Sequence, residues 1–163
     1  MSTAGIDAFI NFTNVTGESG DDTFKEWTAV KAFSLEVANS VNHDNQGTGL
    51  GSGIVDVSKL SVELLFDKAA ITLRQYIVKG THINDIKLNV RRQGGKQETW
   101  YSLVLTNALV SKSLLTYEGG LFHAAIELAF QKHKESYCSQ EYGSGSKGAE
   151  ISYEWDAHAN KGG

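Results

Sequence analysis

Residues 60–80 read LSVELLFDKAAITLRQYIVKG, and this stretch carries the pattern of a strand that runs directly into a helix. Apolar side chains alternate with polar ones along its first part, which is typical of a half-buried β-strand. After that the apolar residues recur at helical spacing. Asp67 stands where a helix N-cap is favoured, and Gly80 where a left-handed residue ends a helix. The stretch therefore predicts a strand followed by one capped helix at about residues 67–80.

The same alternation of apolar and polar side chains recurs elsewhere in the chain. The alternating apolar residues are Phe33, Leu35 and Val37; Ile86, Leu88 and Val90; Tyr101, Leu103, Leu105 and Leu109; Phe122, Ala124, Ile126, Leu128 and Phe130; and Ile151, Tyr153 and Trp155. This pattern indicates antiparallel strands with one face on a core. Because closure removes exposed strand edges, roughly seven or more strands favour a barrel. The sequence predicts a mainly β fold, a small β-barrel of two antiparallel sheets flanked by one α-helix.

Length and composition favour one domain. With 163 residues, of which 40% are hydrophobic, the chain is expected to form a single domain over 1–163. The formal net charge is -4 and no basic cluster stands out, so no nucleic-acid partner is expected. No apolar run approaches the roughly 20 residues that span a bilayer, so no membrane partner is expected either. Residues 1–12 lack the pattern of a signal peptide, and the chain is expected to be cytoplasmic when synthesised.

The longest irregular stretch is expected at residues 39–53, and it ends in the glycine-rich run GTGLGSG at 47–53. A glycine-rich phosphate loop must open a helix, whose N-terminus then binds the phosphate. Here the run leads into a strand, so a phosphate site is not favoured. A loop of this length in a compact domain is usually either functional or disordered. Its glycines favour a flexible loop that allows close approach of backbone segments.

Side chains that could carry chemistry are few and scattered. His133 and Cys138 are two candidate metal ligands without a further pair at zinc-like spacing, so no metal site is expected. Cys138, the single cysteine, is interpreted as a buried small apolar residue in a reducing compartment. Asp21, Asp22 and Glu18 fall in a turn, where carboxylates are normally solvated. The sequence predicts neither an enzyme nor a cofactor.

The order of the features along the chain is more specific than any one of them. In sequence they are GES at 17–19 with Asp21, the glycine-rich run at 47–53, DKA at 67–69, GTHI at 80–83, Gly94-Gly95, LVS at 109–111, Gly119-Gly120 and GSKG at 145–148. This order resembles the haemolysin-coregulated protein (Hcp) family, the tube component of the bacterial type VI secretion system. The resemblance covers about residues 6–159. One departure is that Thr48, Leu50 and Ser52 interrupt a run that is often purer glycine in the family.

The resemblance implies a structural role. Hcp proteins form hexameric rings that stack into a tube, which a contractile sheath expels with its spike, and in some systems the lumen carries small effector proteins. The implied partners are other copies of the chain, sheath and spike proteins, and effectors. Secretion with the tube requires no signal peptide, and no fused toxin domain is expected after Gly163. The implied ring-stacking residues are Gly47, Thr48, Gly49, Leu50, Gly51, Ser52 and Gly53.

Two other functions stay open on the residues alone. The first is a monomeric β-barrel that binds a lipid or small ligand in its interior, although small barrels usually fill their interior with side chains. The second is an enzyme on a barrel scaffold, which lacks a catalytic constellation. Mass in solution separates the first of these from a ring, because a ring of six would have about six times the 17.7 kDa of one chain.

Overall fold

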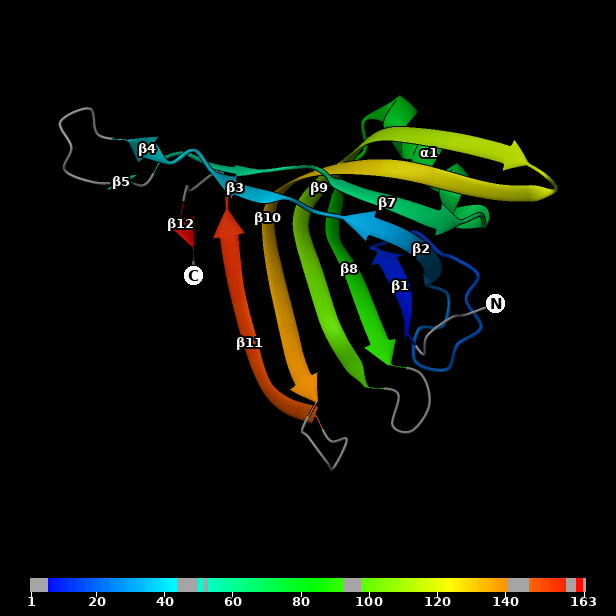
Figure 1. The fold of residues 1–163 in the computed structure, drawn as a ribbon. Coiled ribbons are helices and arrows are strands. Elements are labelled where there is room, and N and C mark those ends of the chain that lie inside the picture. Colours follow the sequence, from blue (N-terminus) through cyan, green and yellow to red (C-terminus); the bar gives the residue numbers. More distant parts are fainter. Residues whose placement is uncertain are drawn as a thin grey trace.

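The computed structural model of the chain describes residues 6–43, 50–51, 53–92, 98–140, 147–157 and 161–162. Its elements, in chain order, are β1 (Ile6–Phe12), β2 (Thr28–Ser34), β3 (Val37–Asn39), β4 (Asn42–His43), β5 (Leu50–Gly51), β6 (Val55–Val57), β7 (Leu60–Leu65), α1 (Lys68–Lys79), β8 (Ile83–Arg92), β9 (Thr99–Glu118), β10 (Leu121–Gln140), β11 (Lys147–Asp156) and β12 (Lys161–Gly162). Figure 1 shows a bent sheet with one helix behind its upper wall and two projections at opposite ends.

Six strands close a barrel, which confirms the predicted fold class. The sheet order β10-β7-β2-β1-β8-β9 is completed by pairing of β9 with β10, and every pairing in this circle is antiparallel. β9 and β10 are each 20 residues long and take part in both walls of the barrel. The first half of β10 pairs with β7, and its second half pairs with β11. β11 therefore lies beside the barrel, outside the closed circle (Figure 1).

The interior of the barrel is filled by alternate side chains of its strands. The fully buried aliphatic residues are Ile10, Leu60, Leu64, Leu73, Ile83, Ile86, Leu88, Leu103, Leu105, Ile126 and Leu128. Most of them come from the alternating segments of the sequence, so burial of those segments is confirmed. Burial of each such side chain stabilises the fold by about 1.5–3 kcal/mol relative to exposure.

The helix begins and ends where the sequence predicts. Asp67 Oδ1 accepts a hydrogen bond from the Ala69 amide at 2.9 Å, as an N-cap does. Gly80 follows the helix with a φ of 66°, a left-handed conformation that glycine adopts without steric cost. Ala69 and Leu73 are fully buried and join the barrel core. The local sequence predicts both ends of the helix, and Glu18 adds a distant cap at the N-terminus, where its Oε2 accepts the Lys68 amide proton at 2.7 Å.

Several residues of the predicted apolar faces are not buried, namely Leu109, Val37, Phe122, Ile151 and Tyr153. On β9, Ala108 and Val110 are buried in place of Leu109, which is half-buried. The alternation shifts by one residue because Asn107 adopts a φ of 54°, which interrupts the regular pleat. Ile151 is 71% exposed because its strand, β11, lies outside the closed barrel.

Two glycines form the turn between the longest strands. Gly119 and Gly120 have φ values of 59° and 83° and connect β9 to β10. Two successive residues with positive φ are typical of the tight turn that joins antiparallel strands. The glycine pair thus accounts for the reversal of the chain between these strands. Gly94 and Gly95 lie outside the described residues.

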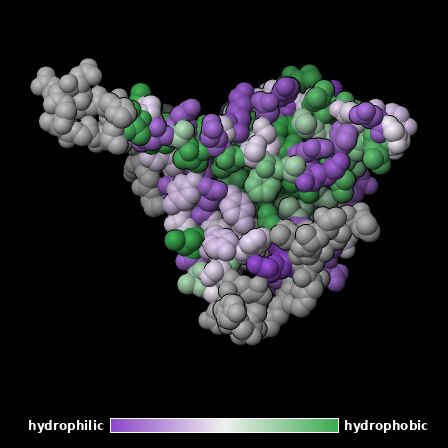
Figure 2. Space-filling model, viewed as in Figure 1, coloured by the Kyte–Doolittle hydropathy of each residue, from purple (hydrophilic) through white to green (hydrophobic). Residues whose placement is uncertain are grey.

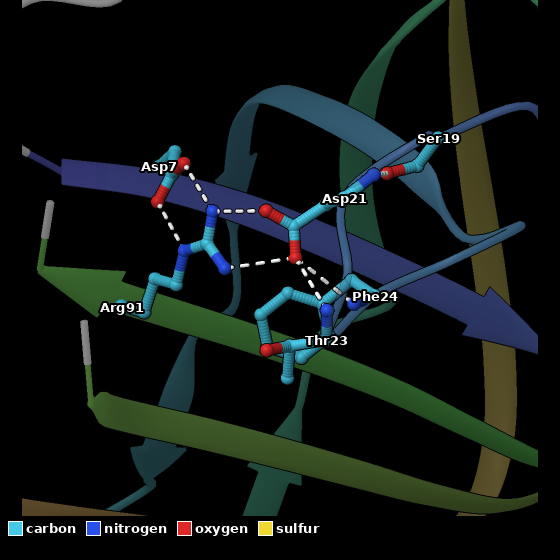
Figure 3. Close-up of polar contacts among 6 residues, drawn as sticks. All are labelled: Asp7, Ser19, Asp21, Thr23, Phe24 and Arg91. Atoms are coloured by element: carbon cyan, nitrogen blue, oxygen red, sulfur yellow. Dashed lines mark hydrogen bonds and ion pairs between the residues drawn. The ribbon is translucent and has the colours of Figure 1, made fainter. Parts of the chain in front are cut away.

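Asp21 is partly buried and ion-paired, whereas its turn position predicted a solvated carboxylate. Its carboxylate and that of Asp7 both bind Arg91, which is 5% exposed (Figure 3). Arg91 Nε and Nη2 donate to the two oxygens of Asp7 at 3.1 and 3.2 Å. Arg91 Nη1 donates to Asp21 Oδ1 at 2.9 Å, and Nη2 contacts Oδ2 of the same carboxylate. The partner lies 70 residues away in the sequence, so the local turn pattern could not reveal it.

The same carboxylate organises the loop before β2. Asp21 Oδ1 also accepts the amide protons of Thr23 and Phe24 at 2.9 and 3.0 Å. The Arg91 guanidinium, together with these amides, lowers the pKa of Asp21 from its usual 3.8 to about 2. Phe24 stacks on Phe9 with 4.9 Å between ring centroids, and both rings flank the guanidinium. The loop is thereby fastened to the barrel wall.

Candidate functional site

A narrow arm projects from one end of the barrel (Figure 1). It consists of two short antiparallel ladders, in which β3 pairs with β6 and β4 pairs with β5. β2 leads into β3 and β6 leads into β7, so the arm continues the line of these two barrel strands. The sequence predicted an irregular stretch at 39–53. The structure instead gives paired strands on both sides of a short central segment.

The predicted ring-stacking residues fall on this arm. Leu50 and Gly51 form β5, and the Gly53 amide donates to Asn39 Oδ1 at 2.9 Å. Gly47, Thr48, Gly49 and Ser52 lie outside the described residues. A Cβ atom at Gly53 would lie 1.4 Å from the Ser40 carbonyl oxygen. Glycine is therefore required here by the close approach of the two sides of the arm.

The described part of the arm also exposes aliphatic side chains. Val37, Val41 and Ile54 are 49%, 50% and 77% exposed. Val37 lies in β3, and Val41 and Ile54 lie beside the paired segments. The arm is thus a thin ladder that exposes three aliphatic side chains among polar ones.

One wall of the barrel ends in two open strand edges. This wall consists of β2, β7, β10 and β9, with β2 and β9 on its two outer sides. β2 pairs with β1 only over Thr28–Val30, which leaves 31–34 without a second neighbour among the described strands. β9 pairs with β8 only as far as Ala108, so residues 111–118 also lack a second neighbouring strand among the described strands. At Ser113 this edge is contacted by α1, because Arg74 Nη1 donates to the Ser113 carbonyl oxygen at 3.1 Å. Unpaired edges of this kind are templates for pairing with another chain. Alternation in the sequence indicates which face of a strand is buried but not which strands pair with it. It therefore did not reveal these edges.

The outer face of this wall carries a shallow groove of about 370 Å³. Its floor is made of small side chains, namely Ala32, Ser34, Ser61 and Ala125. Two ion pairs lie across the same face, Lys112–Glu127 at 3.8 Å and Lys31–Glu63 at 3.5 Å. Both pairs are exposed and contribute little to stability. The groove suits a contact with a polypeptide, because it combines small alanine and serine side chains and the exposed Leu114 with a charged rim.

The β9–β10 hairpin carries a group of exposed apolar residues at its free end. We call Phe66, Tyr117, Leu121 and Phe122 the hairpin-end cluster. The Phe122 ring stacks on Phe66 at 4.8 Å and contacts Tyr117 at 4.9 Å between centroids. Tyr117 and Leu121 are both 65% exposed. Phe122, which the alternation placed on the core face, is 46% exposed because the hairpin extends beyond the barrel.

His133 and Cys138, the two candidate metal ligands, each contact a neighbouring side chain of β11, Tyr153 and Glu150 respectively. His133 Nε2 lies 3.0 Å from the Tyr153 hydroxyl, which in turn donates to Glu135. Burial of His133 lowers the pKa of its imidazole, which favours the neutral form. Cys138 is 7% exposed, which confirms its interpretation as a buried residue. No three His, Cys, Asp or Glu side chains form a metal-binding group within the described part of the chain.

These features define a class of protein. The chain is a small closed β-barrel whose open edges, arm and exposed aromatic end are suited to contacts with other polypeptides. Across the described ranges, none of the helical structure is both long enough and apolar enough to cross a bilayer.

Comparison with known proteins identifies the family. Residues 9–137 match the family described as "Type VI secretion system effector, Hcp". The chain is 30% identical over 158 residues to Protein hcp1 of Pseudomonas aeruginosa, which covers 95% of this chain and 97% of that protein. The chain therefore belongs to the Hcp family of type VI secretion tube proteins, as its sequence resemblance implied.

Solved structures agree with this assignment. A structure described as "a type six secretion system protein" superposes with a TM-score of 0.90 at 25% identity, over 97% of this chain and 99% of that chain. Hcp1 from Salmonella typhimurium has the same fold, with a TM-score of 0.78 at 23% identity, over 98% of this chain and 99% of that chain.

Proposed function

We propose that the chain is the repeating subunit of a tube in which six copies close into a ring and the rings stack. The observation that carries the proposal is the four-stranded wall with two open edges, β2 on one side and β9 on the other. In this proposal the chain acts as a single Hcp-like domain over 1–163. The tube is expelled by the type VI machine, so the chain is made in the cytoplasm and leaves it without a signal peptide.

The strand directions in the wall favour such a ring. The wall contains four antiparallel strands, so its two outer strands, β2 and β9, run in opposite directions. When β9 of one copy lies beside β2 of the next, the junction is again antiparallel. The contact joins two different edges, and a heterologous contact of this kind generates a closed ring when its rotation closes. The number six comes from the family resemblance.

A ring of this kind also assigns a role to the groove. Side chains of α1 join the same buried core as the inward side chains of the four-stranded wall, so the helix lies on the core side of this wall. In a ring, the core side with the rest of the barrel would face outward. The opposite face, with its groove of about 370 Å³, would then line the lumen. We propose that small effector proteins are carried against this face. The sheath and the spike proteins would contact the outer surface and the end of the tube.

The test of the ring is the mass of the protein in solution, measured by light scattering or native mass spectrometry. A ring predicts about six times 17.7 kDa. The competing function, a monomeric barrel that binds a small ligand, predicts 17.7 kDa at all concentrations. A stable monomer would overturn the proposal.

The glycine-rich loop is proposed as the stacking segment, with Gly47, Thr48, Gly49, Leu50, Gly51, Ser52 and Gly53 reaching toward the adjacent ring. Leu50 is its one large apolar residue. Leu50→Asp should leave ring mass unchanged and lower the yield of stacked tubes, because a charge replaces an apolar contact. Leu50→Ile is the matched control and should stack normally. Normal tube yield of Leu50→Asp in electron micrographs would contradict this assignment.

A further inference from the structure

We infer that His123 is a pH-operated switch that makes the groove of the four-stranded wall accept acidic polypeptides when its imidazole is protonated. In its neutral form His123 holds the Lys31 ammonium. In its protonated form it binds the Glu63 carboxylate and releases Lys31. The switch lies within one copy of the chain, whereas the cargo that it controls rests on the proposed function, in which this groove lines a lumen.

One nitrogen of His123 faces a donor and an acceptor at the same time. Its Nδ1 lies 3.1 Å from Lys31 Nζ and 3.3 Å from Glu63 Oε1, and these two partners lie 3.5 Å apart. An ammonium only donates hydrogen bonds, and an ionised carboxylate only accepts them. Nδ1 must therefore carry a lone pair to bind Lys31. A protonated imidazole has a proton on Nδ1, so the gain of charge ends the bond to Lys31 and favours the bond to Glu63.

Three strands of the wall bring these side chains together. His123 lies near the start of β10, Glu63 on the neighbouring β7, and Lys31 on β2 beyond it. The register of β2 against β7 shifts between Val30 and Ala32, so Lys31 occupies an irregularity of its strand. A bulge of this kind re-aims a side chain. It accounts for the reach of the Lys31 ammonium across β7 toward His123.

The other groups that face His123 come from its two neighbouring strands. On β9 the residue opposite His123 is Thr116, and the diagonal residue on the same face is Glu118. On β7 the residue opposite is a leucine. Among the described residues, the carboxylates that face a protonated His123 are therefore Glu63 and Glu118, and the facing cation is Lys31.

Exchange of partners at this position needs little free energy, because all three side chains are accessible to water. Lys31, Glu63 and His123 have side chains that are 38%, 40% and 25% exposed. Exposed ion pairs contribute little to stability, so protonation exchanges one contact for another without unfolding the wall. Imidazole is also the side chain whose charge ordinarily changes between about pH 5 and 8.

Protonation changes the charge at the rim of the groove. Glu63 lines the groove together with Lys112 and Glu127. While His123 is neutral, the formal charges of the Lys31–Glu63 and Lys112–Glu127 pairs cancel. Protonation adds one positive charge and frees the Lys31 ammonium from His123, so this part of the wall becomes cationic. An acidic segment is then attracted to it.

The wall also offers apolar contacts to such a segment. Leu114, which is 55% exposed, lines the groove beside its small alanine and serine side chains. On the side seen in Figure 2, hydrophilic side chains are interspersed with apolar ones over the part of the barrel where Figure 1 draws β2, β7 and β10. The cargo expected here is therefore an acidic polypeptide that also presents apolar side chains.

The first test measures the pH at which His123 gains its proton, by NMR of the full chain with isotope-labelled histidine. Lys31→Gln removes a neighbouring positive charge and should raise this pH, whereas Glu63→Gln removes a negative charge and should lower it. Each shift should be about 0.5–1 pH unit, as expected for one close charge in water. Lys112→Gln is the matched control, since Lys112 pairs with Glu127 on the same wall, and it should leave His123 unchanged.

This measurement needs no ring, so it separates the switch from the proposed function. Failure of the wild-type chain to form rings would overturn the proposed function and leave the titration of His123 readable. Identical titration of His123 in wild type, Lys31→Gln and Glu63→Gln would overturn the switch. The spectrum of His123→Gln identifies the resonance, and its thermal unfolding shows whether the fold is intact.

The second test asks whether the switch controls binding to rings. The probe is a fluorescent peptide of alternating glutamates and leucines, offered at pH 8 and at pH 6. Wild-type rings should bind it about fivefold more tightly at pH 6, as for one added charge contact in water. His123→Gln should lose most of this difference, whereas His82→Gln, which changes an exposed histidine outside the groove, should keep it. Loss of the pH dependence in both variants or in neither would overturn the inference, and so would intact rings that bind no peptide at either pH.

Discussion

Two aromatic groups with nearly the same ring geometry have opposite surroundings. In the Arg91 region, Phe9 stacks on Phe24 at 4.9 Å, and the two rings are 9% and 3% exposed. In the hairpin-end cluster, Phe66 stacks on Phe122 at 4.8 Å, and they are 36% and 46% exposed. The first group is covered by this chain's own loop, and its charges are paired within the chain. The second is left open and is suited to cover by another chain.

The comparison of these two aromatic groups distinguishes residues that stabilise a single copy from residues suited to contacts between copies. Changes in the Arg91 region should lower the free energy of unfolding of a single copy. Changes at the hairpin end or on the arm should alter stacking with a smaller effect on that free energy. The next three predictions are ordered by the expected size of their effect on unfolding.

The largest effect is expected for Arg91→Met. Arg91 is 5% exposed and is the shared partner of Asp7 and Asp21, so its removal leaves two carboxylates without their cation. Breaking a buried ion pair on one side costs about 3 kcal/mol. For a chain of this length, Tm should fall by roughly 6–12 °C. Urea unfolding followed by circular dichroism measures the change. A loss well under 1 kcal/mol would remove the distinction between the two regions.

A smaller, pH-dependent effect is expected for Asp21→Asn. The amide keeps an oxygen for the Thr23 and Phe24 amides but turns a donor toward Arg91, so we expect a loss of about 2 kcal/mol at pH 7. The folded pKa of about 2 lies below the usual 3.8. The charge of Asp21 therefore stabilises the fold above pH 4, and this contribution is lost as pH falls from about 4 to about 2. The stability difference between wild type and variant should shrink over that range. A constant difference from pH 7 to pH 2 would contradict it.

The smallest effect on unfolding is expected for Gly120→Ala at the tip of the hairpin. Gly120 has a φ of 83°, which an alanine side chain disfavours by about 1 kcal/mol. Gly20→Ala is the control, because Gly20 has ordinary φ and open space around its Cβ position. Stacking should be weakened more than stability, since the turn positions the hairpin-end cluster. Equal urea midpoints for the two variants, with equal stacking, would show that the tip geometry is unimportant.

The parts of the fold that the sequence predicted are those with local causes. The helix bounds depend on Asp67 and Gly80, which act within one turn of the helix ends. The glycine pair at 119–120 carries its own turn preference. The alternating strands follow from burial on one face. The predicted burial fails at Leu109, where the backbone irregularity at Asn107 shifts the alternation. It fails at Ile151 because its strand, β11, lies outside the closed barrel.

The surfaces proposed to be functional were mostly not visible in the sequence. The glycine-rich loop stood out by composition, but the open edges of β2 and β9 depend on where β1 and β8 stop pairing. Asp21 meets Arg91 across 70 residues, which no local pattern encodes. Phe122 looked like a core residue because alternation does not indicate where a barrel ends. Long-range pairing determined each of these outcomes.

The long pairing of β9 with β10, which has one register shift between Glu127 and Leu128, has a mechanical consequence. The ladder runs from Leu121 opposite Glu118 to Tyr137 opposite Tyr101, and β10 also pairs with β7 and β11. Force applied along the hairpin loads many of these hydrogen bonds in shear at the same time, so no single bond carries it. The outer ladder of the arm joins Asn42–His43 to Leu50–Gly51 among the described residues, so this part of the arm has fewer bonds to share a load. Under axial force the arm should therefore yield before the barrel does, which makes the subunit stiffer than the joint it forms.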